Sequence, residues 1–179
     1  FKFILAALVL LFFTGVKDDL LVMDPRKKLL AQVLASAIVV VLGNIRITNF
    51  HGFALIDEVS FLTSVLFTIF VFVVIINGFN LIDGIDGLAS GVAILTASTF
   101  GVWFVMAGDY SQAVIAFALA SAIAAFFRYN VFGKDKKIFL GDTGSLSIGL
   151  IMAVLAVRFL EYEFANPTAF NLISAPTVA

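Results

Sequence analysis

Long apolar runs alternate with short polar stretches along the whole chain. The apolar segments fall at about residues 3–14, 29–43, 61–77, 88–107, 112–127 and 145–160. A helix that crosses the hydrocarbon core of a bilayer needs about 20 predominantly apolar residues, and these segments approach that length once flanking residues are included. The pattern predicts an all-α integral membrane protein with about six transmembrane helices.

The composition agrees with a membrane protein. Of the 179 residues, 62% are hydrophobic, 21 are Phe and only 13% are charged. Core helices of a soluble protein would need a charged outer face that this chain cannot supply. The net charge of −1 gives no reason to expect a nucleic-acid partner. Since cysteine is absent, disulfides, thiolate metal sites and cysteine nucleophiles are excluded.

The first residues resemble a signal peptide only superficially. In 1-FKFILAALVLLFFTG-15 a lysine precedes an apolar run, but no small-residue cleavage site follows. The chain opens inside an apolar run without an initiator Met and stops at 174-SAPTVA-179. We therefore expect residues 1–179 to be one polytopic membrane domain that is incomplete at both ends.

Six crossings would place the connecting segments alternately on the two sides of the membrane. Segments 15–28, 78–87 and 128–144 share one side, and 44–60, 108–111 and 161–179 share the other. Eight basic residues belong to the first side and three to the second, so the positive-inside rule predicts that the first side is cytoplasmic. The eight are Lys17, Arg26, Lys27, Lys28, Arg128, Lys134, Lys136 and Lys137, and the three are Lys2, Arg46 and Arg158.

The external segment 44-NIRITNFHGFALIDEVS-60 alternates polar and apolar residues around His51. Alternation with a period of two around a central glycine predicts a short β-hairpin in this loop. The only histidine of the chain would then be a turn residue.

All the unusual polar clusters fall on the predicted cytoplasmic side. They are 17-KDDLLVMDPRKK-28, 77-NGFNLIDGIDG-87 and 134-KDKKIFLGDTGS-145. The three connections are therefore expected to build one site, whose carboxylates are Asp18, Asp19, Asp83, Asp86 and Asp142.

Five carboxylates at the rim of an apolar bundle repel one another unless cations compensate. Arg26, Lys28 and Lys137 can pair with some of them. Oxygen ligands without cysteine favour a hard cation, Mg²⁺ or alternatively Mn²⁺. Because Mg²⁺ completes its shell with water and substrate phosphate, the site points toward phosphoryl chemistry.

Asn77, Asn80, Asp83 and Asp86 recur at intervals of three. On a continuous α-helix this spacing gives a slowly drifting stripe that could line a cavity wall. The simpler alternative is a helix end with glycine caps and solvated polar side chains.

The stretch 141-GDTGS-145 precedes a helix expected to start near Ser145. Its backbone N–H groups and the helix dipole could hold a phosphate while Asp142 holds a metal. The alternative is that Asp142 or Thr143 merely caps the helix.

In 17-KDDLLVMDPRKK-28 the alternative is a juxtamembrane charge run in which Asp24 and Pro25 start the next helix. The adjacent Asp18 and Asp19 favour chemistry, since a like-charge neighbour can raise one pKa toward a general-base value.

With these motifs the chain resembles the polyprenyl-phosphate N-acetylhexosamine-1-phosphate transferases, the membrane family that includes phospho-N-acetylmuramoyl-pentapeptide transferase. The matching residues are 18-DD-19 with 28-KLLAQ-32, then 77-NGFNLIDGIDGLASG-91, then Asn130 with 137-KIFLGDTGSLSIG-149. The resemblance implies transfer of sugar 1-phosphate from a UDP-N-acetylhexosamine to a polyprenyl phosphate such as undecaprenyl phosphate, with release of UMP and a requirement for Mg²⁺. It also implies a catalytic domain in the bacterial inner (plasma) membrane, with its active site on the cytoplasmic face.

The resemblance assigns a role to each matching residue. Asp142 would be the principal Mg²⁺ ligand, with Asp83 beside it. Asp18 and Asp19 would act on the lipid phosphate, either as base or as a second metal-binding site, and Lys28 would neutralise phosphate. The substrate-binding residues would be Asn80, Asp83 and Asp86 at the nucleotide, Phe139 stacked on uracil with Asn130 nearby, and Lys137 at the phosphates.

Two features refine the resemblance. Ile82 in 80-NLIDGIDG-87 favours the branch that transfers N-acetylglucosamine 1-phosphate to initiate cell-envelope polysaccharide synthesis over the peptidoglycan branch. The segment 133-GKDKK-137 departs from the family pattern between Asn130 and Asp142, and the family's C-terminal histidine motif is absent. The assembly is left open, a homodimer being one option.

Three other classes compete. A transporter predicts polar residues at mid-helix depth and an inverted repeat, whereas the acidic residues here lie at one rim and no repeat is found. A prenyltransferase for aromatic substrates needs two Asp-rich motifs of another spacing. A CDP-alcohol phosphotransferase needs an arginine that does not follow 83-DGIDGLASG-91.

Overall fold

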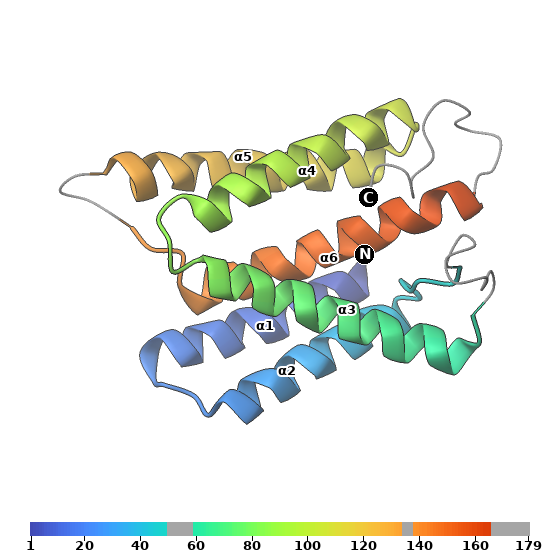
Figure 1. Cartoon of the computed structure of the whole chain (residues 1–179), viewed down its shortest axis with the longest axis horizontal. Helices are drawn as coiled ribbons and strands as arrows, with labels where there is room; N and C mark the ends of the chain where they lie inside the picture. Colours follow the sequence, from blue (N-terminus) through green and yellow to red (C-terminus); the bar gives the residue numbers. More distant parts are fainter. Residues whose placement is uncertain (50–58, 134–137, 166–179) are drawn as a thin grey trace.

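The computed structural model describes residues 1–49, 59–133 and 138–165, with side chains up to Tyr162, and these residues form a bundle of helices (Figure 1). Each expected apolar segment is helical. The elements are α1 (Lys2–Leu20), α2 (Pro25–Ala37), its π-helical continuation η1 (Ile38–Leu42), α3 (Phe61–Ile82), α4 (Leu88–Met106), α5 (Tyr110–Phe132) and α6 (Gly141–Ala165).

Among the described residues, four helices are long and apolar enough to cross a membrane by length and composition. These are α3, α4, α5 and the part of α6 up to Tyr162. Helix α1 ends in the charged Lys17, Asp18 and Asp19, and α2 is 13 residues long with three basic residues in its first turn and a half. The predicted all-α membrane protein is confirmed, and the two remaining crossings stay a prediction.

Helix α6 lies at the centre of the bundle, between α1, α2 and α3 on one flank and the α4–α5 pair on the other (Figure 1). It contributes to both apolar cores. In the first, Leu150 packs with Leu11 and Phe72, and in the second, Leu155 packs with Phe104.

Glycines let α6 approach its neighbours closely. A Cβ on Gly15 of α1 would lie 2.4 Å from the Cα of Thr143, and a Cβ on Gly149 would lie 2.7 Å from the Cα of Ile76. Small residues permit such backbone contact between membrane helices. The contact at Gly15 brings the end of α1 against the start of α6.

Three connections meet at one end of the bundle, on the left in Figure 1. They are residues 21–24, 83–87 and the part of 133–140 that the structure describes. Asp24 caps α2, since its carboxylate accepts a hydrogen bond from the N–H of Arg26 at 2.8 Å, and Pro25 is the first helical residue. The expected convergence of the three polar clusters is therefore found.

The predicted β-hairpin and the turn at His51 fall on residues 50–58, which lie outside the described residues. The described flanks of that segment are joined, since the N–H of Val59 donates to the carbonyl of Thr48 at 3.1 Å. Glu161 fixes this loop to α6. Its carboxylate accepts from the N–H of Thr48 at 2.8 Å and from the hydroxyl at 2.6 Å.

Candidate active site

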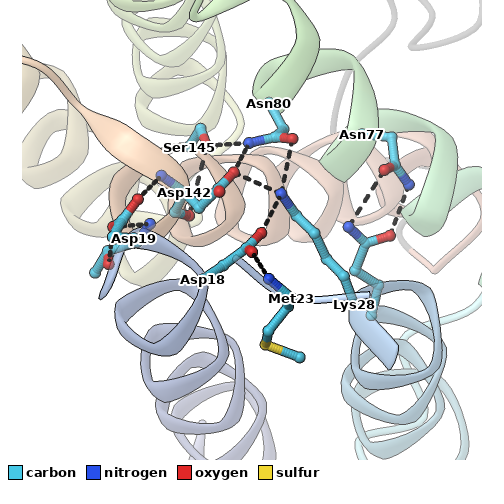
Figure 2. Close-up of polar contacts among 10 residues, drawn as sticks. Asp18, Asp19, Met23, Lys28, Asn77, Asn80, Asp142 and Ser145 are labelled. Carbon is cyan, nitrogen blue, oxygen red and sulfur yellow. Dashed lines mark hydrogen bonds and ion pairs between the residues drawn. The ribbon is translucent and has the colours of Figure 1, made fainter. Parts of the chain in front are cut away.

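The ammonium group of Lys28 lies at the centre of the polar end of the bundle (Figure 2). Its Nζ is 3.0 Å from Oδ2 of Asp18 and 2.5 Å from Oδ1 of Asp142, and it donates to Oδ1 of Asn80 at 3.1 Å. The four side chains come from α1, α2, α3 and α6. One lysine thus joins all three polar clusters found in the sequence.

Asp142 is held from more than one side. Besides the contact with Lys28, its Oδ1 accepts a short hydrogen bond from the side-chain amide of Asn80, and that amide also donates to Oγ of Ser145 at 2.9 Å. Ser145 is fully buried. It was not identified as a site residue from the sequence, although it ends the GDTGS motif.

Asp19 caps α6 from another helix. Its carboxylate accepts from the N–H of Asp142 at 2.8 Å, from the N–H of Thr143 at 3.0 Å and from the hydroxyl of Thr143 at 2.5 Å. Gly141, with φ of 66°, lies so close that a Cβ there would be 2.9 Å from Oδ1 of Asp19. The first turn of α6 is therefore anchored to the last turn of α1.

This arrangement corrects two expectations about the GDTGS motif. Helix α6 begins at Gly141 rather than near Ser145, so the motif is its first turn. The N–H groups of Asp142 and Thr143 donate to Asp19, and that of Gly141 donates to Asp83. The prediction that these groups hold a phosphate is wrong for this structure, because protein carboxylates already occupy them.

Asp83 and Asp86 lie beyond the end of α3, which corrects the predicted continuous stripe. The helix ends at Ile82, Asp83 is its C-cap residue, and Gly87 with φ of 75° turns the chain into α4. Only Asn77 and Asn80 share a helical face, while the exposed Asp86 lies in the turn. Gly87, whose left-handed conformation favours glycine, follows the last position of the expected stripe and leads into α4.

Burial raises the pKa of the Asp83 carboxyl, and the negative charges of Asp142, Asp19 and Asp86 raise it further. The hydrogen bond from Gly141 opposes this shift without cancelling it. A carboxylate in this position would be stabilised by an added cation.

The carboxyls of α1 have the opposite shift. Burial tends to raise the pKa of Asp18, but the hydrogen bonds from the Met23 N–H and from Lys28 outweigh it and lower the pKa. Burial likewise opposes the lowered pKa of Asp19, which follows from its bonds to Thr143 and Asp142. Neither is raised toward a general-base value, as adjacency had suggested.

Asn130 bridges two connections. Its amide oxygen accepts from the N–H of Gly87 at 2.7 Å, and its amide nitrogen donates to the carbonyl of Ile138 at 2.9 Å. The residue is buried. Phe139, next to this bridge, exposes most of its side chain at the rim, while Lys137 lies outside the described residues. Their proposed contacts with substrate stay predictions.

A pocket of about 460 Å³ opens beside Lys28. Four site residues predicted from the sequence line it, namely Asp18, Lys28, Asn80 and Asp142. Gln32 and Asn77 form part of its wall as well. Gln32 was not identified as a site residue, although its position four residues after Lys28 places it on the same face of α2.

The residues present fit a magnesium ion held jointly with substrate. Among the described residues, no three Asp, Glu or His side chains are arranged to hold a metal by themselves. Magnesium commonly takes only one or two protein carboxylates and fills its shell with water and phosphate oxygens. Asp142 and Asp83 would supply these two carboxylates, and Asp83 lies close enough to other carboxylates for their charges to raise its pKa.

The chain is similar to known protein sequences over most of its length. The profile described as glycosyl transferase family 4 matches residues 1–160. The decaprenyl-phosphate N-acetylglucosaminephosphotransferase of Mycolicibacterium smegmatis is 35% identical in an alignment of 177 residues that covers 92% of this chain and 41% of that protein. The Mycobacterium tuberculosis protein of the same name is 32% identical over the same shares.

A second group of relatives matches a shorter region. The phospho-N-acetylmuramoyl-pentapeptide-transferase of Clostridium botulinum strain Eklund 17B is 46% identical over 81 residues, or 45% of this chain and 24% of that protein. The chain thus spans less than half the length of these curated relatives.

Proposed function

The chain belongs to glycosyl transferase family 4, and from this premise we propose that it transfers N-acetylhexosamine 1-phosphate from a UDP-sugar to undecaprenyl phosphate. UMP is the second product. The sugar phosphate favoured here is N-acetylglucosamine 1-phosphate, and the reaction would initiate synthesis of a cell-envelope polysaccharide.

The observation that carries this proposal is the position of Lys28 between Asp18 and Asp142 at the mouth of a polar pocket in a membrane bundle. A reaction between two phosphate-bearing substrates must overcome their mutual repulsion. A lysine ammonium can neutralise phosphate, and the surrounding carboxylates can hold the divalent ion that neutralises the rest.

We favour direct attack. An oxygen of the lipid phosphate forms a bond to the sugar-bearing phosphorus of the UDP-sugar, and the bond from that phosphorus to the oxygen of UMP breaks. The attacking oxygen is already anionic near neutral pH and needs no strong base. This agrees with the lowered pKa of Asp18 and Asp19, which suits them to positioning and charge balance.

Within this reaction the chain's own residues have distinct tasks. Lys28 orients and neutralises a phosphate, Asn80 keeps Lys28 and Asp142 in contact, and Asp142 with Asp83 would hold Mg²⁺. When bound, Mg²⁺ supplies electrophilic stabilisation of the transferring phosphoryl group. Asp86, Asn130, Lys137 and Phe139 stay proposed contacts of the nucleotide or the phosphates.

Two observations support the sugar. The relatives aligned over 92% of this chain bear the name N-acetylglucosaminephosphotransferase, whereas the Clostridium botulinum pentapeptide transferase aligns over 45%. Ile82 points to the same branch. Transfer of phospho-N-acetylmuramoyl-pentapeptide is the second candidate, supported by the higher identity over the shorter region.

The basic residues concentrated at the polar end support a cytoplasmic active site in the bacterial inner membrane. That side is also where a UDP-sugar would be available. The homodimer stays a prediction, which sedimentation of the purified protein in detergent tests.

The deciding experiment uses the full-length protein in detergent with Mg²⁺, undecaprenyl phosphate and a panel of UDP-sugars, and follows UMP release. We expect release with UDP-N-acetylglucosamine that requires the lipid phosphate and falls sharply in Asp142→Asn. Undiminished release by Asp142→Asn would remove the metal assignment. Ion flux through liposomes without UMP release would favour a transporter instead.

A further inference from the structure

A second polar contact joins α2 and α3 about one helical turn further from the polar end of the bundle than the contact between Lys28 and Asn80. The amide nitrogen of Gln32 donates to Oδ1 of Asn77 at 3.3 Å, and the amide nitrogen of Asn77 donates to Oε1 of Gln32 at 2.6 Å. The two carboxamides form a reciprocal pair, and Asn77 is labelled to the right of Lys28 in Figure 2. Gln32 is only 1% exposed.

The spacing along the two helices relates this pair to the site. Lys28 and Gln32 are four residues apart on α2, and Asn80 and Asn77 are three apart on α3, so each couple lies on one helical face. Since the two helices run in opposite directions, the contacts are successive rungs between them (Figure 1). Spacings of three and four residues put the two contacts about 4.5 to 6 Å apart along the helices.

The orientation of the Asn77 carboxamide in the contact with Gln32 is fixed by a third hydrogen bond. The amide nitrogen of Asn77 also donates to the carbonyl of Val73 at 2.8 Å, within α3. With its nitrogen directed to Val73 and Gln32, the Asn77 oxygen is left to accept from Gln32. Sliding one helix against the other would separate the buried Gln32 carboxamide from the half-buried Asn77 carboxamide, and a buried polar group left without its partner is unfavourable.

We propose that Gln32 and Asn77 are positioning residues for the phosphoglycosyl transfer, acting through Lys28. Their pair fixes the depth of α2 against α3, so that the Lys28 ammonium reaches its oxygen partners on three other helices at once. This inference rests on the function proposed above. The rate of the reaction would then depend on the uncharged side chains of Gln32 and Asn77, neither of which is proposed to contact the substrates.

The kinetic test compares three variants of the full-length protein in detergent. Gln32→Met keeps the side-chain volume but removes both cross-helix hydrogen bonds. The exchange Gln32→Asn with Asn77→Gln restores a reciprocal pair of the same total length. Ser36→Ala, one turn further along α2, is the control, because the Ser36 hydroxyl donates to the backbone carbonyl of Gln32 within the same helix at 2.7 Å. This variant removes a hydrogen bond at Gln32 but leaves the cross-helix pair of carboxamides in place.

For Gln32→Met we expect kcat to fall about tenfold or more with little change in KM for the UDP-sugar, since misplacement of a catalytic group by about 1 Å can cost far more than that. The exchange should restore kcat to near the wild-type value, and Ser36→Ala should keep it. A wild-type kcat for Gln32→Met would overturn the proposal.

A second measurement does not depend on activity. Lysines are acylated with an amine-reactive reagent, and the rate at each lysine is followed by mass spectrometry, with the exposed Lys27 as internal reference. Lys28, held by Asp18 and Asp142, should react slowly in the wild type and in the exchanged pair, and several-fold faster in Gln32→Met.

The two readouts separate the failure of the inference from that of the proposed function. If the wild type releases no UMP with any UDP-sugar, the function fails, and the acylation rates still decide whether the pair positions Lys28. If Gln32→Met does not fold, the exchanged pair decides: slow acylation of Lys28 supports the proposal, and fast acylation contradicts it.

Discussion

The carboxylate of Asp19 binds both the backbone N–H and the hydroxyl of Thr143, at 3.0 Å and 2.5 Å. The last turn of α1 thereby caps the first turn of α6, more than a hundred residues later in the chain. One side chain thus connects two of the polar clusters found in the sequence, 17–28 and 134–145.

Replacing Asp19 should destabilise the bundle. Asp19→Ala removes the acceptor for two helix N–H groups, and loss of a cap costs about 0.5–2 kcal/mol. The thermal unfolding midpoint in detergent measures the effect. Asp24→Ala, which removes the local cap of α2, is the matched control for capping without a cross-helix tie. Equal losses in the two variants would show that the tie to α1 adds nothing.

Acid should weaken the same connection. Because the folded-state pKa of Asp19 is lowered from its ordinary value, its contribution to stability is complete above the unfolded-state pKa of about 3.9 and is lost as pH falls through the folded value. We expect the unfolding midpoint to fall with pH in this acidic range. In Asp19→Asn the dependence should be shallower, and an unchanged slope would contradict the assignment.

Gly15 should not tolerate a side chain. In Gly15→Ala the new Cβ would lie 2.4 Å from the backbone of Thr143, so α1 and α6 must separate. Overpacking of this kind typically costs about 1–3 kcal/mol. Gly78→Ala on α3 is the control, because a Cβ there meets nothing within 4 Å and should raise helix stability by about 0.5–1 kcal/mol. Differential scanning fluorimetry in detergent compares the two.

Removing the charge of Lys28 should abolish most activity. Lys28→Met leaves Asp18 and Asp142 without their shared cation and the phosphates without their neutralising group. We expect a loss of about 10²-fold or more in kcat, the scale of a preorganised electrostatic contact. The control is Lys27→Met, an exposed neighbour on the same helix. Comparable losses in both would indicate a general effect of basic charge at the rim.

A variant of Asn130 distinguishes a purely structural role of this residue from direct contact with the nucleotide. In Asn130→Ala the N–H of Gly87 and the carbonyl of Ile138 lose their partner, with an expected cost of about 1–3 kcal/mol. If Asn130 only bridges the two connections, lowering the temperature to restore folding should also restore KM for the UDP-sugar. A raised KM at full folding would support the nucleotide contact that the family resemblance implies.

The sequence was sufficient to predict the helices and the end of the bundle at which the site lies. Hydropathy located the helices, and the predicted alternation of sides placed the segments that contain Asp18, Asn80 and Asp142 at the same end of the bundle. The positions of Asp83 and Asp86 were predicted less well, because both lie beyond the end of α3 rather than on a continuous helix. Glycine caps were one alternative for this stretch, but whether Gly87 ends a helix or leaves room for a neighbour depends on the packing of α5, since a Cβ on Gly87 would lie 2.7 Å from the side chain of Val131.

The pairings within the site could not be predicted from the sequence. A carboxylate such as Asp19 has the same local sequence whether it binds a ligand or caps a distant helix. The choice depends on Gly15 and Gly141, which allow α1 and α6 to touch. The reciprocal amides of Gln32 and Asn77 likewise become visible only when the depth of two helices is known.

Side-chain carboxylates secure both ends of α6. Asp19 holds its first turn, and Glu161 binds Thr48 near its other end. Between Asp142 and Glu161 the helix rises about 28 Å, roughly the thickness of the bilayer core. With both ends held, α6 cannot shift along its axis unless one of these contacts breaks. The position of the Asp142 carboxylate along the bundle therefore depends partly on the contact between Glu161 and Thr48 at the far end of the helix. Antibodies or small molecules that break the contact between Thr48 and Glu161 should therefore change the activity of the proposed site without crossing the lipid.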